Sequence, residues 1–255
     1  MEQIYTIPVN EAFEKGAADK SRGCPFCRLR AELCSNEIDL ILGASVMDPE
    51  TRKKTNEKGF CREHYGDLLS AGKRLPLALL LESHLKKVTE MIKKPVISPS
   101  AAENSSAKHI DRLSSSCYIC ERAEGYLSKM IDTAVILWDR DEAFRQKCSA
   151  QPFFCINHFA RLAAAGKEKL DKKTFAAFYK ELFSKEKAAA EKMCDDVSFF
   201  VRKFDYRFGD EPWNGRENAP EAAIDFICGD RGLKSFSQQV YHKKEQMSKT
   251  VDRYE

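Results

Sequence analysis

One pattern of cysteine and histidine occurs twice in this chain, and it constrains the fold more than any other feature. Each copy is a C-x-x-C pair followed by a C-x-x-H pair, with 33 intervening residues in the first copy and 34 in the second. The members of the first copy are Cys24, Cys27, Cys61 and His64, and those of the second are Cys117, Cys120, Cys155 and His158. Three thiolates and one imidazole, arranged as two close pairs, are the donor set of a closed tetrahedral zinc site.

The simplest assignment gives each copy one zinc ion of its own, so that the chain has two zinc sites. Pairing of ligands across the two copies is the alternative. With all four positions of an ion filled by protein, no position remains for water or substrate, which favours a structural metal over a catalytic one. We therefore expect that the protein has no catalytic residues and is not an enzyme. The alternative is an active site built from residues that lie far apart in the sequence.

Two other uses of the same side chains compete with zinc. An iron–sulfur cluster is held by the same kinds of residue, and the spacing does not separate it from zinc. Thiol redox chemistry is suggested by Pro25 and Phe26 between the first two cysteines. The redox motif follows a β-strand, however, and here the upstream segment is polar. Redox chemistry is the weaker interpretation.

The two copies agree outside the ligands as well. Shifting the chain by 93 or 94 residues aligns Ile38 with Ile131, Phe60 with Phe154, Tyr65 with Phe159, Leu68 with Leu162, and Ala71-Gly72-Lys73 with Ala165-Gly166-Lys167. Agreement of this extent indicates an internal duplication. We divide the chain into a first Cys3His repeat (1–94), a flexible linker (95–116), a second repeat with a long helix and a C-terminal extension (117–232), and a polar tail (233–255).

Apolar residues recur at helical spacing in nearly every patterned segment, which predicts an all-α fold with two metal-bound helical units and a long C-terminal helix. Helices are expected over 76–94, over 171–204 and over 219–228, the last ending at Gly229. The ligand pairs are expected at helix starts, where the dipole favours thiolate. Short helices after the two histidines should end at Gly72 and Gly166. Short ribbons beside the metals are compatible with the pattern.

Composition bounds the function. The chain has 43% hydrophobic residues and a net charge of only +3, so it has no strong basic field and nucleic acid is not an expected partner. No export signal or membrane span is evident, and a cytoplasmic protein is the simplest expectation. Outside the repeated pattern, Cys34, Cys194 and Cys228 have apolar neighbours and are expected to pack as small hydrophobes.

The segment KFDYRFGDEPWNG at 203–215 mixes aromatic and charged residues and has two interpretations. It provides a possible ligand or partner site made of Asp205, Tyr206, Arg207, Asp210, Glu211 and Trp213. Alternatively it ends the long helix and folds back, with Trp213 in the core and Arg207 paired to a carboxylate. We favour the second interpretation, because turns that end helices commonly use Gly, Asp and Pro.

The chain resembles an uncharacterised bacterial domain-of-unknown-function family. The resemblance runs from about residue 5 to about residue 232 and is carried by Gly23-Cys24-Pro25-Phe26-Cys27, Gly59–His64, Cys117–Cys120, Phe154–His158 and Lys203–Trp213. The second copy departs from the first by having Tyr118 where the first has Pro25. The resemblance implies the ligand pattern and brings no activity with it. We therefore predict a zinc-stabilised helical binding or scaffold protein whose partner is an unknown protein or small molecule.

Overall fold

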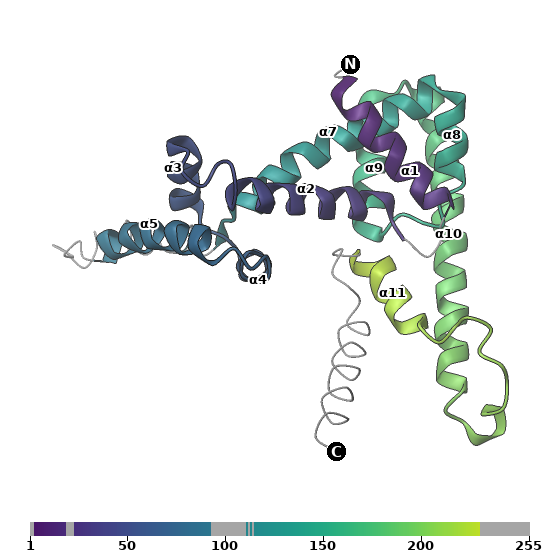
Figure 1. Ribbon diagram of the computed structural model, residues 1–255. Coiled ribbons are helices and arrows are strands. Elements are labelled where there is room, and N and C mark those ends of the chain that lie inside the picture. The colour runs from purple at the N-terminus through teal and green to yellow at the C-terminus, as the bar shows by residue number, and fades with distance from the viewer. Residues whose placement is uncertain (1–2, 19–22, 93–110, 112, 114, 230–255) are drawn as a thin grey trace, which may run out of the picture. The chain divides into compact units, whose positions relative to one another are not determined.

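The computed structural model describes residues 3–18, 23–92, 111, 113 and 115–229 (Figure 1). These residues contain helices and no strand, which confirms the all-α fold and leaves no ribbon beside the eight ligand candidates. The α-helices are α1 (Thr6–Ala18), α2 (Pro25–Ile41), α3 (Pro49–Lys58), α4 (Arg62–Ser70), α5 (Arg74–Ile92), α7 (Tyr118–Arg140), α8 (Glu142–Ser149), α9 (Ile156–Lys169), α10 (Lys172–Arg202) and α11 (Ala219–Cys228).

The chain divides into two compact units. Unit 1 comprises residues 1–31 and 129–255, and unit 2 comprises residues 32–128. Helices α2 and α7 each contribute residues to both units. These two units are defined by contacts in space. The division of the chain at residues 94 and 116 was instead drawn from the internal repeat in the sequence, and it stays a prediction. The linker proposed for 95–116 lies almost wholly outside the described residues, and the tail proposed for 233–255 lies entirely outside them.

The helices follow the same order in both repeats, which supports the duplication. A long helix (α2 or α7) is followed by a short one (α3 or α8), by the helix that starts at the C-x-x-H pair (α4 or α9), and by another long helix (α5 or α10). The expected helices at 76–94 and 171–204 are α5 and α10, and the expected third helix is α11. Asp171 begins α10 as predicted, because its carboxylate accepts the amide hydrogens of Lys173 and Thr174.

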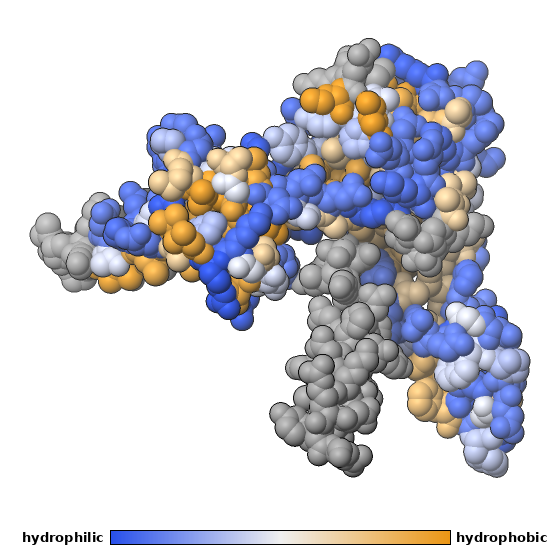
Figure 2. All heavy atoms as spheres, viewed as in Figure 1, coloured by the Kyte–Doolittle hydropathy of each residue, from blue (hydrophilic) through white to orange (hydrophobic). Residues whose placement is uncertain are grey.

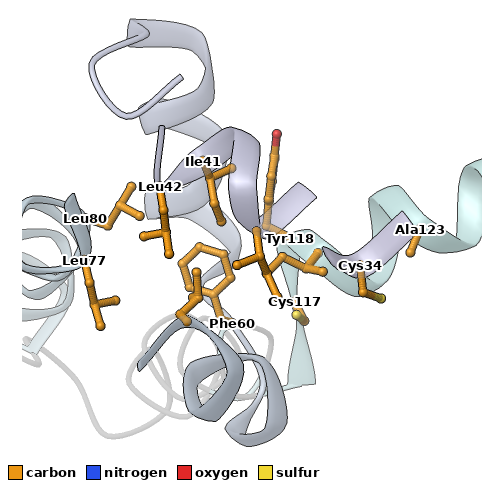
Figure 3. Close-up of a cluster of buried hydrophobic side chains, with 12 residues drawn as sticks. Cys34, Ile41, Leu42, Phe60, Leu77, Leu80, Cys117, Tyr118 and Ala123 are labelled. Atoms are coloured by element: carbon orange, nitrogen blue, oxygen red, sulfur yellow. The ribbon is translucent and has the colours of Figure 1, made fainter. Parts of the chain in front are cut away.

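The core of unit 2 is formed where α2, α4, α5 and the start of α7 meet (Figure 3). Ile41, Leu42 and Leu68 are at most 2% exposed there. The ring of Phe60 lies between Leu77 and Tyr118 in the close-up, so the residue before Cys61 belongs to the core. Burial of these side chains at both ends of the C-x-x-H segment fixes its position by the hydrophobic effect.

The core of unit 1 contains a cluster of aromatic rings contributed by α1, α2, α8 and the segment before α9. Phe13 contacts Phe26, Phe144 and Phe154 with ring centroids 4.8–6.0 Å apart. All four rings are less than 2% exposed. Phe26 lies between the first two cysteines and Phe154 lies directly before Cys155, so this cluster positions two ligand pairs at once.

Gly166 does not end its helix, contrary to the expectation from sequence. Helix α9 continues through Gly166 to Lys169, and Gly166 is buried. A Cβ atom at this position would lie 2.6 Å from the ring of Phe178 on α10. Gly166 therefore allows close packing of α9 on α10, whereas its counterpart Gly72 has a φ of +74° and follows the end of α4, as expected.

Two of the unassigned cysteines also depart from expectation. Cys194 and Cys228 are exposed, because they lie on the outer faces of α10 and α11. Cys34 is buried as expected, and so is Cys148. An apolar neighbour in the sequence does not predict burial, because successive residues of a helix point in different directions and Ile227, beside Cys228, is itself 61% exposed.

The surface is mixed in character. Figure 2 shows hydrophilic side chains over most of the visible face around α8, with smaller apolar patches elsewhere. Among the described residues, none of the helices combines the length and apolarity that crossing a membrane requires.

We predict that Gly166→Ala destabilises the protein by roughly 1–3 kcal/mol, because the added methyl group overpacks the contact between α9 and Phe178. Gly125→Ala is the matched control, since Gly125 is an exposed residue inside α7 and a Cβ added there would have no neighbouring atom within 4 Å. That control should stabilise by about 0.5–1 kcal/mol through helix propensity. Urea denaturation of both variants measures the difference. Equal effects of the two substitutions would contradict the packing role of Gly166.

Candidate metal centres

Each of the four ligand pairs straddles the start of a helix, as predicted. Helices α2, α4, α7 and α9 begin one residue after Cys24, Cys61, Cys117 and Cys155 respectively. The first ligand therefore precedes the helix and the second lies in its first turn, three residues later. In α7 the amide of Cys120 donates to the sulfur of Cys117 at 3.5 Å. Unpaired amides and the positive end of the helix dipole both favour a thiolate at this place.

The structure brings the eight residues together in two clusters. Cluster A lies in unit 1 and consists of Cys24, Cys27, Cys155 and His158. Cluster B lies in unit 2 and consists of Cys61, His64, Cys117 and Cys120. Within each cluster the four ligand atoms all lie within 4.8 Å of one another. In both, the Nδ1 atom of the histidine faces the sulfur atoms.

The atoms of cluster A are closely spaced. Nδ1 of His158 lies 3.2 Å from the sulfur of Cys155, 3.4 Å from that of Cys27 and 3.6 Å from that of Cys24. The sulfur atoms of Cys27 and Cys155 are 3.6 Å apart. The ring of Phe26 packs beside the imidazole with centroids 5.7 Å apart.

Cluster B has nearly the same dimensions. Nδ1 of His64 lies 3.2 Å from the sulfur of Cys61 and 3.3 Å from those of Cys117 and Cys120. The sulfur atoms of Cys61 and Cys120 are 3.9 Å apart. The two C-x-x-C pairs are therefore equivalent, although the second has Tyr118 where the first has Pro25. Both of these residues occupy the first position of a helix.

The ligand sets cross the repeats, so the assignment of one ion to each repeat is wrong and the alternative pairing is the observed one. Each cluster joins the C-x-x-C pair of one repeat to the C-x-x-H pair of the other. The physical reason is the length of the intervening helices. At 1.5 Å per residue, α2 is about 25 Å long and α7 about 35 Å long. The short helices α3 and α8, of 10 and 8 residues, do not span that distance on return.

The spacing of the donors fits a single tetrahedral ion. With metal–sulfur bonds of about 2.3 Å and metal–nitrogen bonds of about 2.0 Å, tetrahedral angles put ligand atoms about 3.5–3.8 Å apart. The observed separations between sulfur and Nδ1 atoms, 3.2–3.6 Å, and between sulfur atoms, 3.6 and 3.9 Å, are close to these values. Three thiolates and an imidazole suit zinc in particular, since zinc accepts soft sulfur and borderline nitrogen donors together.

The thiols of cluster A cannot all ionise without a cation. The hydrogen bond that the Cys27 thiol donates to Cys155 and its hydrogen bond with Cys24, followed by burial, raise the pKa of Cys27 far above its ordinary value. Burial raises the pKa of Cys24 to about 12. Hydrogen bonds from Cys24 and Cys27 lower the pKa of Cys155, so one thiolate is favoured and the other two are opposed. A divalent ion would offset this repulsion and deprotonate all three.

In cluster B the imidazole and one thiol favour each other's charged form. Burial alone would lower the pKa of His64, but hydrogen bonds to Cys117 and Cys34 raise it to about 10. Burial alone would raise the pKa of Cys117, but the hydrogen bond from His64 and those from the backbone lower it to about 6. The buried Cys34 thus lies beside a ligand without belonging to the cluster. A bound cation would replace this proton-mediated attraction.

The two clusters differ in their access to solvent. All four residues of cluster A are buried, with exposed fractions of 1–4%. In cluster B, His64 and Cys117 are buried, whereas Cys61 and Cys120 are only partly so. Cluster B is therefore the one that solvent and small reagents reach.

The surroundings of cluster A include residues that the sequence did not single out. Gly229, just after α11, has a φ of +83°, and a Cβ there would lie 2.9 Å from the sulfur of Cys27 and 3.1 Å from that of Cys155. Buried Glu186 accepts the amide hydrogen of Phe154 at 2.7 Å, and burial raises its pKa to about 7. The glycine was recognised only as the end of a helix, and nothing in the sequence marks Glu186.

The residues proposed as a ligand or partner site in 203–215 make contacts among themselves and with the end of α10. Arg207 forms a bidentate ion pair with Asp205, and Arg202 pairs with Glu211. Trp213 packs on Phe199 and Phe200, with centroids 6.3 and 5.5 Å apart. Tyr206 is 91% exposed and Asp210 is exposed. These contacts correspond to a turn that folds back on the helix, and binding at this segment stays a prediction.

The comparisons with known proteins place the chain in context. A family described as "Family of unknown function (DUF6062)" matches residues 1–233, and the match confirms the resemblance noted from the motifs. Neither the curated proteins nor the solved structures include one that matches significantly.

Paired substitutions test the crossed ligand sets. Cys27→Ser/Cys155→Ser removes two ligands of cluster A and should leave about one of two zinc ions per chain. Cys27→Ser/Cys61→Ser damages both clusters and should leave none tightly bound. Zinc in the dialysed proteins, measured by mass spectrometry of the metal, decides between the arrangements. Ligand sets confined to single repeats would give the opposite order.

A second prediction concerns Gly229. Gly229→Ala should reduce zinc occupancy of cluster A, because its methyl group would collide with two ligand sulfurs. Gly215→Ala is the control, since Gly215 also has a positive φ, +77°, with nothing within 4 Å of an added Cβ. Both variants should lose roughly 1–3 kcal/mol of stability from the backbone conformation. Only Gly229→Ala should lose metal, as measured by competition with a chromogenic chelator; equal zinc affinities would contradict the contact.

Proposed function

The chain belongs to this family of unknown function, DUF6062, and from that premise, which supplies no activity, we propose that it is a zinc-stabilised helical binding or scaffold protein. Cluster A and cluster B would each hold one zinc ion, giving two per chain. The single observation that carries the proposal is the spacing of the donors, all within 4.8 Å in each of two sets.

The donor spacing supports one ion per cluster over an iron–sulfur cluster. Two sulfur atoms bound at about 2.3 Å to one ion at tetrahedral angles lie about 3.8 Å apart, close to the observed sulfur–sulfur distances of 3.6 and 3.9 Å. Thiolates of a polynuclear cluster bind different iron atoms and are held farther apart by the inorganic core. Donor sets as compact as these favour the single ion.

Burial and donor number support a structural role for the ions. Each set already supplies four ligands, so a bound zinc would have no open position for water or substrate. Binding of metal at such sites is coupled to folding and supplies roughly 10 kcal/mol per site on the scale of zinc-finger peptides. We therefore propose no enzymatic reaction at either cluster.

All ten cysteines of the chain are free, which suits a reducing compartment, and we propose a cytoplasmic location on that ground. The partner is proposed to be a protein or a small molecule. Nucleic acid is not favoured, because the net charge is only +3.

Thiol redox chemistry is the second candidate, and one observation favours it. The sulfur atoms of Cys27 and Cys155 lie 3.6 Å apart, so a small movement would allow a disulfide once the metal left. In cluster B the partly exposed Cys61 and Cys120 are the thiols that an oxidant would reach first. A redox function would therefore require release of zinc as its first step.

Metal analysis of protein purified without oxygen tests the proposal. We expect about two zinc ions per chain, no visible absorption, and unfolding in excess strong chelator followed by circular dichroism. Release should occur in two phases, and Cys120→Ser should abolish the fast one because cluster B is the more exposed. A brown preparation with iron and sulfide, or a chain that stays folded without metal, would overturn the proposal.

A further inference from the structure

We propose that an exposed apolar stripe on α10 is the surface through which two copies of this chain pair, with their two α10 helices antiparallel. Helix α10 has 31 residues, and α9 and α11 pack against it. Its buried apolar residues are Phe178, Leu182, Ala189 and Phe199, which share one side of the helix. The inference goes beyond the proposed function, because it rests on the surface of α10 and not on a metal.

The α10 stripe lies beside this buried side and is open to solvent. Its positions are 183, 187, 190, 194, 197 and 201, with 204 just after the helix ends. Phe183, Val201 and Phe204 are 50%, 66% and 77% exposed. Ala190 and Cys194 between them are exposed as well. A continuous row of apolar side chains in solvent marks an interaction surface, whereas scattered ones do not.

The spacing of the α10 stripe fits another helix. Its positions follow one another at alternating steps of four and three residues, which is the spacing of the contact line between two coiled helices. From 183 to 204 this line is about 30 Å long at the rise of an α-helix. Lys187 is the polar member, and its ammonium group pairs with Glu191 of the same helix at 3.8 Å. Its hydrocarbon stem can therefore lie in the contact line.

The order of side-chain sizes favours a second copy in the reverse direction. Bulky residues lie at both ends of the stripe, with Phe183 at one end and Val201 at the other, and the small Ala190 and Cys194 lie at its centre. A two-fold axis across the helix needs a surface that is alike from either end, and this surface meets that need. Two crossing helices are closest at the crossing point, where small residues allow the approach.

Reversal about position 192 pairs every member of the stripe. It places Ala190 opposite Cys194 of the second copy, and Phe183 opposite its Val201. It also places Lys187 opposite Val197, so that the two copies of this lysine do not face each other. Parallel pairing in register would instead put each lysine against its own copy. The antiparallel order therefore keeps like residues apart and fills both ends of the seam.

Sedimentation equilibrium of the full chain tests the pairing. We expect the mass to approach twice the chain mass of 29.0 kDa as the concentration rises to about 100 μM, since one helix pair is a small interface and binds weakly. A mass that stays at 29.0 kDa throughout would overturn the proposal.

A charge placed in the stripe locates the surface. Val201→Glu should raise the dissociation constant at least about tenfold, because two-fold symmetry places two carboxylates in the apolar seam. Ile7→Glu is the matched control, since Ile7 lies on α1 and is 67% exposed, against 66% for Val201. The control should pair as the unsubstituted protein does. Equal effects of the two substitutions would place the contact elsewhere and refute the stripe.

Disulfide trapping reads the direction of pairing. Ala190→Cys should form linked dimers with Cys194 of the second copy when treated with oxidised glutathione, as seen on a non-reducing gel, because facing positions come within about 7 Å. Adding Cys194→Ser should abolish the linkage. Ala188→Cys is the control, since Ala188 is exposed on α10 but lies outside the stripe. Linkage of the unsubstituted protein through Cys194 would contradict the antiparallel order.

Zinc measured in the same samples separates this inference from the proposed function. A folded chain that holds two zinc ions and stays monomeric would refute the pairing alone. A folded chain that pairs through the stripe without zinc would refute the proposed function alone.

Discussion

The junction between a C-x-x-C pair of one repeat and a C-x-x-H pair of the other is the interaction on which the rest of the structure depends. Both pairs lie at helix starts, so each junction brings two helix N-termini together around three sulfurs and one imidazole. Without a cation, thiols at such spacing oppose one another's ionisation, as the raised pKa of Cys27 records. A cation bound at the junction would offset this repulsion, so folding and metal binding are coupled there.

Crossing of the ligand sets makes the two repeats interdependent. Each repeat provides the start of one long helix, α2 or α7, to one unit and the helices that follow it to the other. Aromatic residues adjacent to the ligands, such as Phe26 and Phe154, link each junction to the hydrophobic core. A single repeat would leave every ligand pair without its complement. Two copies of the repeat are therefore needed to complete the two clusters.

The sequence predicted the helices and the eight residues that gather in the two clusters, because both depend on local patterns. Spacing within a C-x-x-C pair and apolar periodicity depend on a few neighbouring residues, and Asp171 marks a helix start by its side chain alone. Which C-x-x-C pair joins which C-x-x-H pair is not a local property, since it depends on how far α2 and α7 extend between the pairs. Gly166 was misinterpreted for a related reason: a glycine that ends a helix and one that admits a ring from another helix look the same in sequence.

The two clusters have the same donor atoms but lie in different surroundings. Cluster A is buried, and Gly229 at the end of α11 lies directly against its sulfurs. Cluster B is partly exposed through Cys61 and Cys120 and adjoins the core of unit 2 shown in Figure 3. Because exposure governs how readily chelators and oxidants reach a thiolate, we expect a bound ion to exchange more readily at cluster B than at cluster A. The same two residue types thus form one buried cluster and one partly exposed cluster, which differ in access and not in donor atoms.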